Sequence, residues 1–166
     1  MRLMLHCLSG TLLFGLCITS AHGASRSVPL ADYVKTAESI VVGTVVAVED
    51  TGERLKIKRG NVNVDYPFLR AVVQVKQMIK GPKDLDEVVL HATDSTGHPP
   101  MVLDQECVFF IYKEQHAGPW KGKRTATQVE IRDGMAEPVN IAIRGEPAQQ
   151  TLEEFLAKIE KILHRR

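Results

Sequence analysis

The apolar segment at residues 39–49 (SIVVGTVVAVE) constrains the fold more than any other feature of this sequence. It is rich in β-branched residues, which favour strands, and apolar side chains occupy both alternating positions. A strand with this pattern has to be buried on much of both faces. Gly43, in its middle, predicts a bend or a bulge.

Further strands are predicted where apolar, β-branched and aromatic residues lie between turn signals. Lys80-Gly81-Pro82 and Asp133-Gly134 are the strongest of these turn signals. The polar, basic residues 50–64 are expected to form a hairpin tip or a long loop. The predicted strands cover residues 68–79, 87–93, 107–113 (CVFFIYK, the most hydrophobic) and 127–132, with a last short strand at 139–143.

Helices are predicted at both ends of this β-rich region. Residues 30–37 have apolar side chains at helical spacing, directly after Pro29. A second helix begins after Thr151, which forms a capping box with Glu154. Its apolar stripe is expected to pack on the sheet, with binding to a partner as the alternative. The stripe consists of Leu152, Phe155, Leu156, Ile159, Ile162 and Leu163.

These elements predict a mainly β protein with flanking helices. Short strands separated by turns indicate a five-stranded OB-like barrel, closed or nearly closed, with a short N-terminal and a longer C-terminal helix. No repeat or linker interrupts residues 24–166, which are expected to form a single domain.

Residues 1–23 have the pattern of a cleavable signal peptide. Arg2 precedes an apolar run over residues 3–18, and the small residues Ala21 and Gly23 stand before Ala24. An uncleaved membrane helix and a lipoprotein signal are the alternatives. The sequence therefore predicts an extracytoplasmic protein, periplasmic or secreted, with no membrane span after cleavage.

Cysteine content and charge limit the partners and the means of stabilisation. Two of the three cysteines lie within residues 1–23, so Cys107 has no internal disulfide partner and is expected to be a small buried hydrophobe. The 21 Lys and Arg include Arg2, so the remaining cations equal the 20 Asp and Glu. Without a net positive charge, nucleic acid is not an expected partner.

No constellation of catalytic or metal-ligating residues stands out. The three histidines His91, His98 and His116 have none of the compact spacings used by zinc sites. No nucleophile elbow frames a serine, and Cys107 lies in an apolar run rather than an electropositive one. The sequence therefore predicts no catalytic residue, no metal and no cofactor.

Two basic segments are the candidate binding residues. OB-folds bind oligonucleotides and oligosaccharides through loops of this kind, and an aromatic ring among cations suits stacking. Because residues 24–166 have no net charge, a protein or a polysaccharide is the expected partner. The residues are Arg54, Lys56, Lys58 and Arg59 in one segment and Trp120, Lys121, Lys123 and Arg124 in the other.

The order of these elements resembles the netrin-like domain, in particular the N-terminal domain of the tissue inhibitors of metalloproteinases, an OB-fold barrel. The resemblance covers residues 30–113 and rests on three features: the V-V-G-x-V strand, the strand ending in Lys80-Gly81, and the acidic turn before the aromatic strand at residues 104–112. It implies this fold and an extracytoplasmic setting. Those inhibitors chelate zinc through an N-terminal cysteine, whereas this chain has Ala24 there and lacks their disulfides, so zinc-chelating inhibition is not expected.

The leading hypothesis is an exported, non-catalytic module that binds a protein or an envelope glycan. One alternative is a small extracytoplasmic hydrolase whose site is assembled around His91 or His98. Another is a structural component of an envelope assembly that uses the C-terminal helix as its contact.

Overall fold

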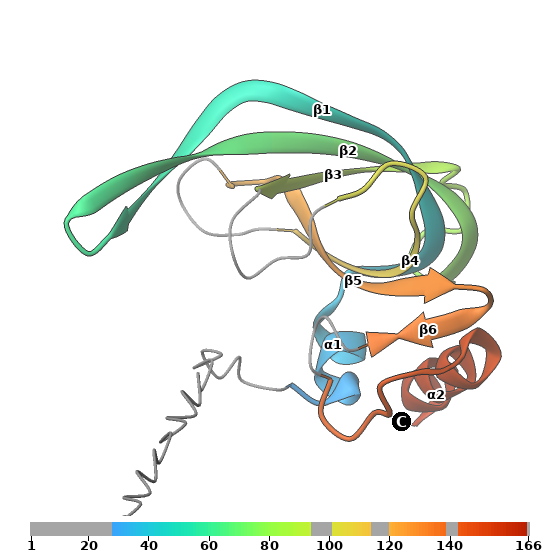
Figure 1. Ribbon diagram of the computed structural model, residues 1–166. Helices are drawn as coiled ribbons and strands as arrows, with labels where there is room; N and C mark the ends of the chain where they lie inside the picture. Colours follow the sequence, from blue (N-terminus) through green and yellow to red (C-terminus); the bar gives the residue numbers. More distant parts are fainter. Residues whose placement is uncertain (1–27, 94–100, 114–119, 139–142, 166) are drawn as a thin grey trace, which may run out of the picture.

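The computed structural model describes residues 28–93, 101–113, 120–138 and 143–165 (Figure 1). The predicted signal peptide lies outside them. In the described part, no helix is long and apolar enough to cross a membrane. The elements are α1 (Leu30–Thr36), β1 (Ser39–Arg59), β2 (Val62–Lys80), β3 (Glu87–Thr93), β4 (Glu106–Lys113), β5 (Arg124–Arg132), β6 (Met135–Glu137), β7 (Gln150–Thr151) and α2 (Leu152–His164).

The strands form one antiparallel sheet in the order β3-β2-β1-β4-β5-β6-β7. The prediction of a mainly β protein with a short N-terminal and a longer C-terminal helix is therefore confirmed. Closure into a five-stranded barrel is wrong. β3 and β5 lie next to each other but form no ladder, and β6 occupies the Glu130–Arg132 end of β5.

The two extra strands were missed because they are only three and two residues long. A pattern of alternating burial needs a longer segment before it can be recognised. The predicted strand at 139–143 is not found where it can be checked: residues 139–142 lie outside the described part, and Ile143 belongs to no strand. Ile143 is instead buried beneath the helices.

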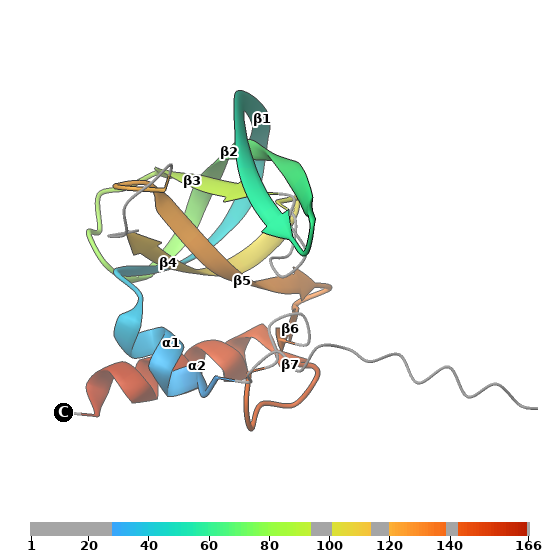
Figure 2. The same cartoon turned by 90° about the vertical axis from the view of Figure 1, so that its left-hand side faces the viewer.

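Residues 50–64 form a hairpin rather than a loop. β1 and β2 continue beyond the body of the sheet and pair from Arg54 opposite Pro67 to Arg59 opposite Val62. No other described strand pairs with this part of either strand. The hairpin consequently projects as a two-stranded arm (Figures 1 and 2).

The sheet buries apolar side chains on both faces, as the pattern of residues 39–49 predicts. On β4, Phe109 contributes to the core on the concave side, whereas Phe110 packs under the helices. The concave core comprises Val41, Val45, Ala71, Val73, Val88, Leu90, Ala92, Met101, Cys107, Phe109 and Ile111. The helix-side core comprises Leu30, Val34, Ala37, Ile40, Val42, Val108, Phe110, Val129, Ala136, Ile143, Phe155 and Ile159.

Gly43 is required by the close approach of β2. A Cβ at this position would lie 2.6 Å from the backbone oxygen of Gln74 and 2.6 Å from a methyl group of Val73. The pairing of β1 with β2 shifts register between Val42 and Gly43, so the irregularity predicted there is confirmed.

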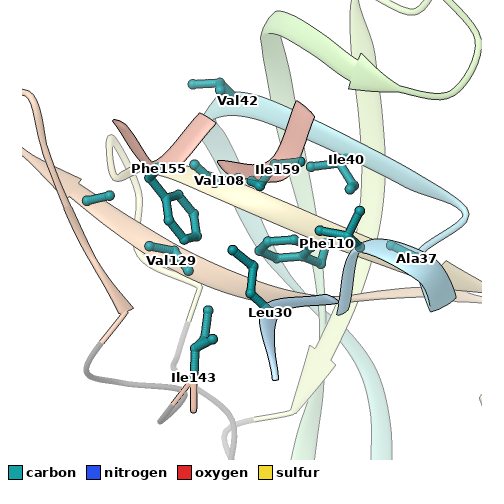
Figure 3. Packing of buried hydrophobic residues seen from close by; sticks show 12 residues of the cluster. Leu30, Ala37, Ile40, Val42, Val108, Phe110, Val129, Ile143, Phe155 and Ile159 are labelled. Atoms are coloured by element: carbon teal, nitrogen blue, oxygen red, sulfur yellow. The ribbon is translucent and has the colours of Figure 1, made fainter. Parts of the chain in front are cut away.

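Both helices are fastened to the sheet. The ring of Phe155 in α2 meets the ring of Phe110 edge to face, with centroids 6.5 Å apart (Figure 3). The Nζ of Lys80 donates hydrogen bonds to the carbonyls of Val34 (2.9 Å) and Ala37 (2.5 Å), which satisfies free carbonyls at the end of α1. The predicted capping box of Thr151 is present, and the apolar stripe of α2 packs on the sheet.

Replacing the fully buried Phe155 should show how much α2 contributes to stability. We expect Phe155→Ala to lower the free energy of unfolding by about 3–5 kcal/mol, because the large cavity left between helix and sheet cannot collapse. Urea denaturation followed by circular dichroism measures this loss. The matched control is Glu160→Ala on the exposed face of α2, expected within about 0.5 kcal/mol of the parent. Equal stability of the two variants would contradict the packing described.

Candidate binding site

Phe68 is the centre of a third group of side chains, separate from both cores. It is only 1% exposed, yet it belongs to neither core. The edge of its ring meets Trp120, with centroids 4.6 Å apart, and the ring of His91 lies 5.8 Å away. The Nζ of Lys123 sits 3.9 Å from the Phe68 ring centroid, a cation–π contact.

Strand register explains why Phe68 and His91 meet. β2 and β3 pair Phe68 with Thr93 and Arg70 with His91, which makes Phe68 and His91 diagonal neighbours on one face. Ala71, which faces the concave core, points the opposite way from Arg70. The Phe68 group therefore lies on the convex side of β2 and β3.

The base of the hairpin is tied to the segment that leads into β5. The carboxylate of Glu53 accepts from the Nζ of Lys123 at 2.9 Å, and the Lys123 side chain is 24% exposed. On the same stretch of β1, the hydroxyl of Thr51 donates to the carbonyl of Phe68 at 2.7 Å. These contacts join three segments that are distant in sequence, and Trp120 lies at their junction. We call Phe68, His91, Trp120, Lys123 and Glu53 the Trp120 cluster.

The predicted residues after Trp120 separate into two roles. Lys123 turns inward to Phe68 and Glu53, whereas Lys121 and Arg124 are exposed. Trp120 itself is half-buried. The structure therefore brings together Trp120 and Lys123, and leaves two cations on the surface around the indole.

The predicted hairpin cations are spread along the arm instead of meeting at one point. Arg54 is exposed and donates to the carboxylate of Asp50 (2.8 Å) and the carbonyl of Glu53 (3.0 Å). Lys56 is exposed and stands opposite Asp65. Lys58 and Arg59 follow at the end of β1, with their backbones paired to Asn63 and Val62.

The sequence does not identify Phe68 and Glu53 as members of a site, and it offers His91 only as a metal ligand or as the centre of a hydrolase site. Neither Phe68 nor Glu53 lies in a local sequence pattern that indicates a binding site. Phe68 begins a predicted strand, and Glu53 lies among basic residues. Only the pairing of β2 with β3 and the curvature of the hairpin bring them to Trp120.

His91 is held in its neutral form. Burial lowers its pKa, the positive charges of Lys123 and Arg70 lower it further, and a hydrogen bond to the backbone of Arg124 opposes them in part. Its Nδ1 is buried without a hydrogen-bond partner. The hydrogen bond between His91 and the backbone of Arg124 also links β3 to β5, two neighbouring strands that share no backbone ladder.

The geometry around His91 offers little to a hydrolase. In the part of the chain that the structure describes, His91 has no hydrogen bond to a carboxylate, and Cys107 lies in the concave core on the other face. Burial and the charges of Glu130 and Glu106 raise the pKa of Cys107 to about 12. His98 and His116 lie outside the described residues. Among the residues inside them, no group of three His, Cys, Asp or Glu could hold a metal.

Comparison with known proteins adds no family to this description: no protein-family model matches the chain, and no curated protein is similar to it. The evidence on function therefore comes from the residues of this chain alone.

The buried thiol of Cys107 should be inert while the protein is folded. With a pKa raised to about 12, almost no thiolate exists at pH 8, and the side chain is completely covered. We expect iodoacetamide to leave Cys107 unmodified in the native protein and to alkylate it in 6–8 M urea (roughly the range that unfolds such domains). Mass spectrometry distinguishes the two results. Rapid labelling without denaturant would show that the concave core is accessible.

His91 should make stability depend on pH. Because its folded-state pKa lies below the ordinary value of 6.5, its contribution is present above that value and is lost as the pH falls toward the folded-state pKa. We expect the free energy of unfolding to decline from pH 7.5 to 5 more steeply in the parent than in His91→Gln (approximate limits around the pKa of free histidine). Parallel curves for the two proteins would argue against a buried neutral His91.

Proposed function

We propose that the protein is an extracytoplasmic, non-catalytic binding module for a protein or an envelope glycan. The observation that carries the proposal is the fixed position of Trp120. Its indole contacts the ring of Phe68. Lys123 lies over that ring and is held by Glu53 of the hairpin, while Lys121 and Arg124 remain exposed beside the indole. A preformed aromatic surface flanked by cations loses little conformational freedom on binding.

The location of this surface in the sheet supports the same proposal. β1 to β5 follow the order β3-β2-β1-β4-β5, and β3 lies next to β5. This is the order in which the strands of an OB-like Greek-key barrel are arranged, and such barrels bind through the face of strands 2 and 3 and the loops that flank it. The Trp120 cluster lies on the convex side of β2 and β3, between the β1–β2 hairpin and the segment entering β5. We therefore also propose that the sheet is an opened OB-like barrel of the netrin-like type.

The chemistry suits a ligand with both apolar and anionic groups. An indole face accepts the C–H surface of a sugar ring or an apolar side chain, and the exposed Lys121 and Arg124 can pair with carboxylates or phosphates. The equal number of cations and anions over residues 24–166 does not favour nucleic acid. An extracytoplasmic setting rests on the predicted signal peptide at residues 1–23.

Trp120 is the chain's single tryptophan, so its fluorescence reports directly on binding. We expect its emission to change when the protein is titrated with a matching ligand from a panel of soluble envelope polysaccharides and proteins of the same compartment. For any such ligand, the pair Lys121→Glu and Arg124→Glu should weaken binding at least about tenfold, roughly 1.4 kcal/mol.

The matched control reverses two exposed cations near the C-terminus, Lys161→Glu on α2 and Arg165→Glu directly after it; α2 lies on the helix side of the sheet, away from the β1–β2 hairpin (Figure 1). This control should bind like the parent. Binding that is equally strong in both double variants, with no change in Trp120 emission, would mean that the ligand is held elsewhere on the protein.

A further inference from the structure

Residues 24–166 hold equal numbers of cations and anions, but these charges are separated between two ends of the molecule. At one end, residues 52–66 of the hairpin hold four cations against two carboxylates, and residues 120–124 add three cations. At the other end, five carboxylates lie in the β2–β3 connection, in the turn before β4 and at the first residues of β3 and β4, near the cations Lys76 and Lys83; they are Asp84, Asp86, Glu87, Asp104 and Glu106. The hairpin tip and these two connections lie at opposite ends of the sheet (Figure 1).

The acidic groups come from neighbouring strands. Glu87 pairs with Gln74, Gln74 with Thr44, and Thr44 with Glu106, so these residues form one row across four strands. With strands about 4.8 Å apart, the row spans roughly 14 Å. Glu106 of this row is ion-paired at 2.9 Å with Lys76, which lies two residues along β2 from Gln74.

Exposed apolar side chains gather at the same acidic end. Among the described residues, the large apolar side chains that are clearly exposed are Val62 (61%), Leu103 (54%), Val102 (47%) and Val46 (40%). The turn that carries Val102 and Leu103 is bonded to β1 beside Val46: the N–H of Val45 donates to the carbonyl of Gln105 (3.0 Å), and the N–H of Asp104 donates to the carbonyl of Val45 (2.8 Å). We call Val46, Val102 and Leu103, with Asp104, the acidic-apolar patch.

The fourth exposed apolar residue, Val62, lies at the opposite end. Its backbone pairs with that of Arg59 at the end of the hairpin, in an arm whose sequence also holds Arg54, Lys56 and Lys58. The tip and the acidic-apolar patch are thus complementary in charge, and both expose apolar surface. Val46 and Arg59 are far apart along β1, about 40 Å at 3.3 Å per residue before curvature is allowed for. A tip therefore does not reach the patch of its own molecule.

We propose that the protein associates with a second copy of itself head to tail. The basic hairpin of one molecule docks on the acidic-apolar patch of the next through the exposed residues Arg54, Lys56 and Val62, which we call the tip. The two surfaces are different, so the contact is heterologous and leaves a free tip and a free patch on every dimer. Further copies can add, and the assembly grows with concentration. Exposed charges supply much of the attraction, so salt weakens it. This inference does not depend on the ligand of the Trp120 cluster.

Sedimentation equilibrium of the purified protein tests the association. At low salt we expect the weight-average mass to rise beyond that of a dimer as concentration increases. The apparent association constant should fall at least about tenfold between 20 mM and 500 mM NaCl, a range over which the screening length shrinks severalfold. A monomer at every concentration, or a mass that stops at the dimer, would overturn the proposal.

Two surface variants, each blocked on one side, identify the contact. The tip variant carries Arg54→Glu, Lys56→Glu and Val62→Ser; the patch variant carries Val102→Ser and Leu103→Lys, which removes apolar surface and adds a charge that repels the basic tip. We expect each alone to be monomeric, and an equimolar mixture to form a 1:1 dimer that does not grow, because one intact tip meets one intact patch. Circular dichroism and thermal unfolding confirm that both variants are folded, and Val102→Ser with Leu103→Ser replaces the patch variant if the charge prevents folding.

The variant Lys161→Glu with Arg165→Glu, at the C-terminal end of the chain, serves as the matched control and should associate like the parent. If either blocked variant associates as the parent does, or if the mixture stays monomeric, the contact is not the one proposed. Because the association is measured without any other ligand, its failure leaves the ligand-binding proposal for Trp120 unaffected. Loss of Trp120 binding would likewise leave the association result standing.

Discussion

Burial of the central strands on both faces is the constraint on which the rest of this structure depends. β1 and β4 send alternate side chains to a concave core and to a core beneath the helices, so neither face can remain in water. Curling of the sheet covers one face, and α1 and α2 cover the other. The helix-side core is built from β1, β4, β5 and β6, with Ile79 near the end of β2 packed against it. The convex side of β3 and of the first half of β2 is left for Phe68, His91 and Trp120.

The Trp120 cluster is held together by a chain of side-chain contacts from Phe68 to Glu53. Phe68 is almost completely buried although it belongs to neither core, because Trp120 and Lys123 cover it. Lys123 is in turn neutralised by Glu53 of the hairpin. His91, kept neutral by burial and by nearby cations, spans the seam between β3 and β5. The candidate site therefore lies where β3 and β5 approach each other without a backbone ladder, and side-chain contacts connect the strands there instead.

Much of the fold could be predicted from local patterns, whereas little of the site could. The helix at residues 30–37, the capping box of Thr151 and the irregularity at Gly43 all depend on neighbouring residues or on strand composition, and all are present. β6 and β7 were missed because each has too few residues to show a period. Trp120 and Lys123 were identified from their types, but Phe68 and Glu53 were not, since their roles depend on which strands become neighbours.

By itself, the sequence determined the strand-rich composition, the helices at both ends and the need to cover both faces of residues 39–49, because propensity and hydrophobic periodicity act over a few residues. Over residues 24–166, it also determined the equal number of cations and anions and the absence of a disulfide partner for Cys107. Only the tertiary structure decided that the barrel stays open, that residues 50–64 project as an arm, and that basic and acidic surfaces occupy opposite ends. These properties follow from strand register and curvature, which depend on contacts between residues far apart in the chain.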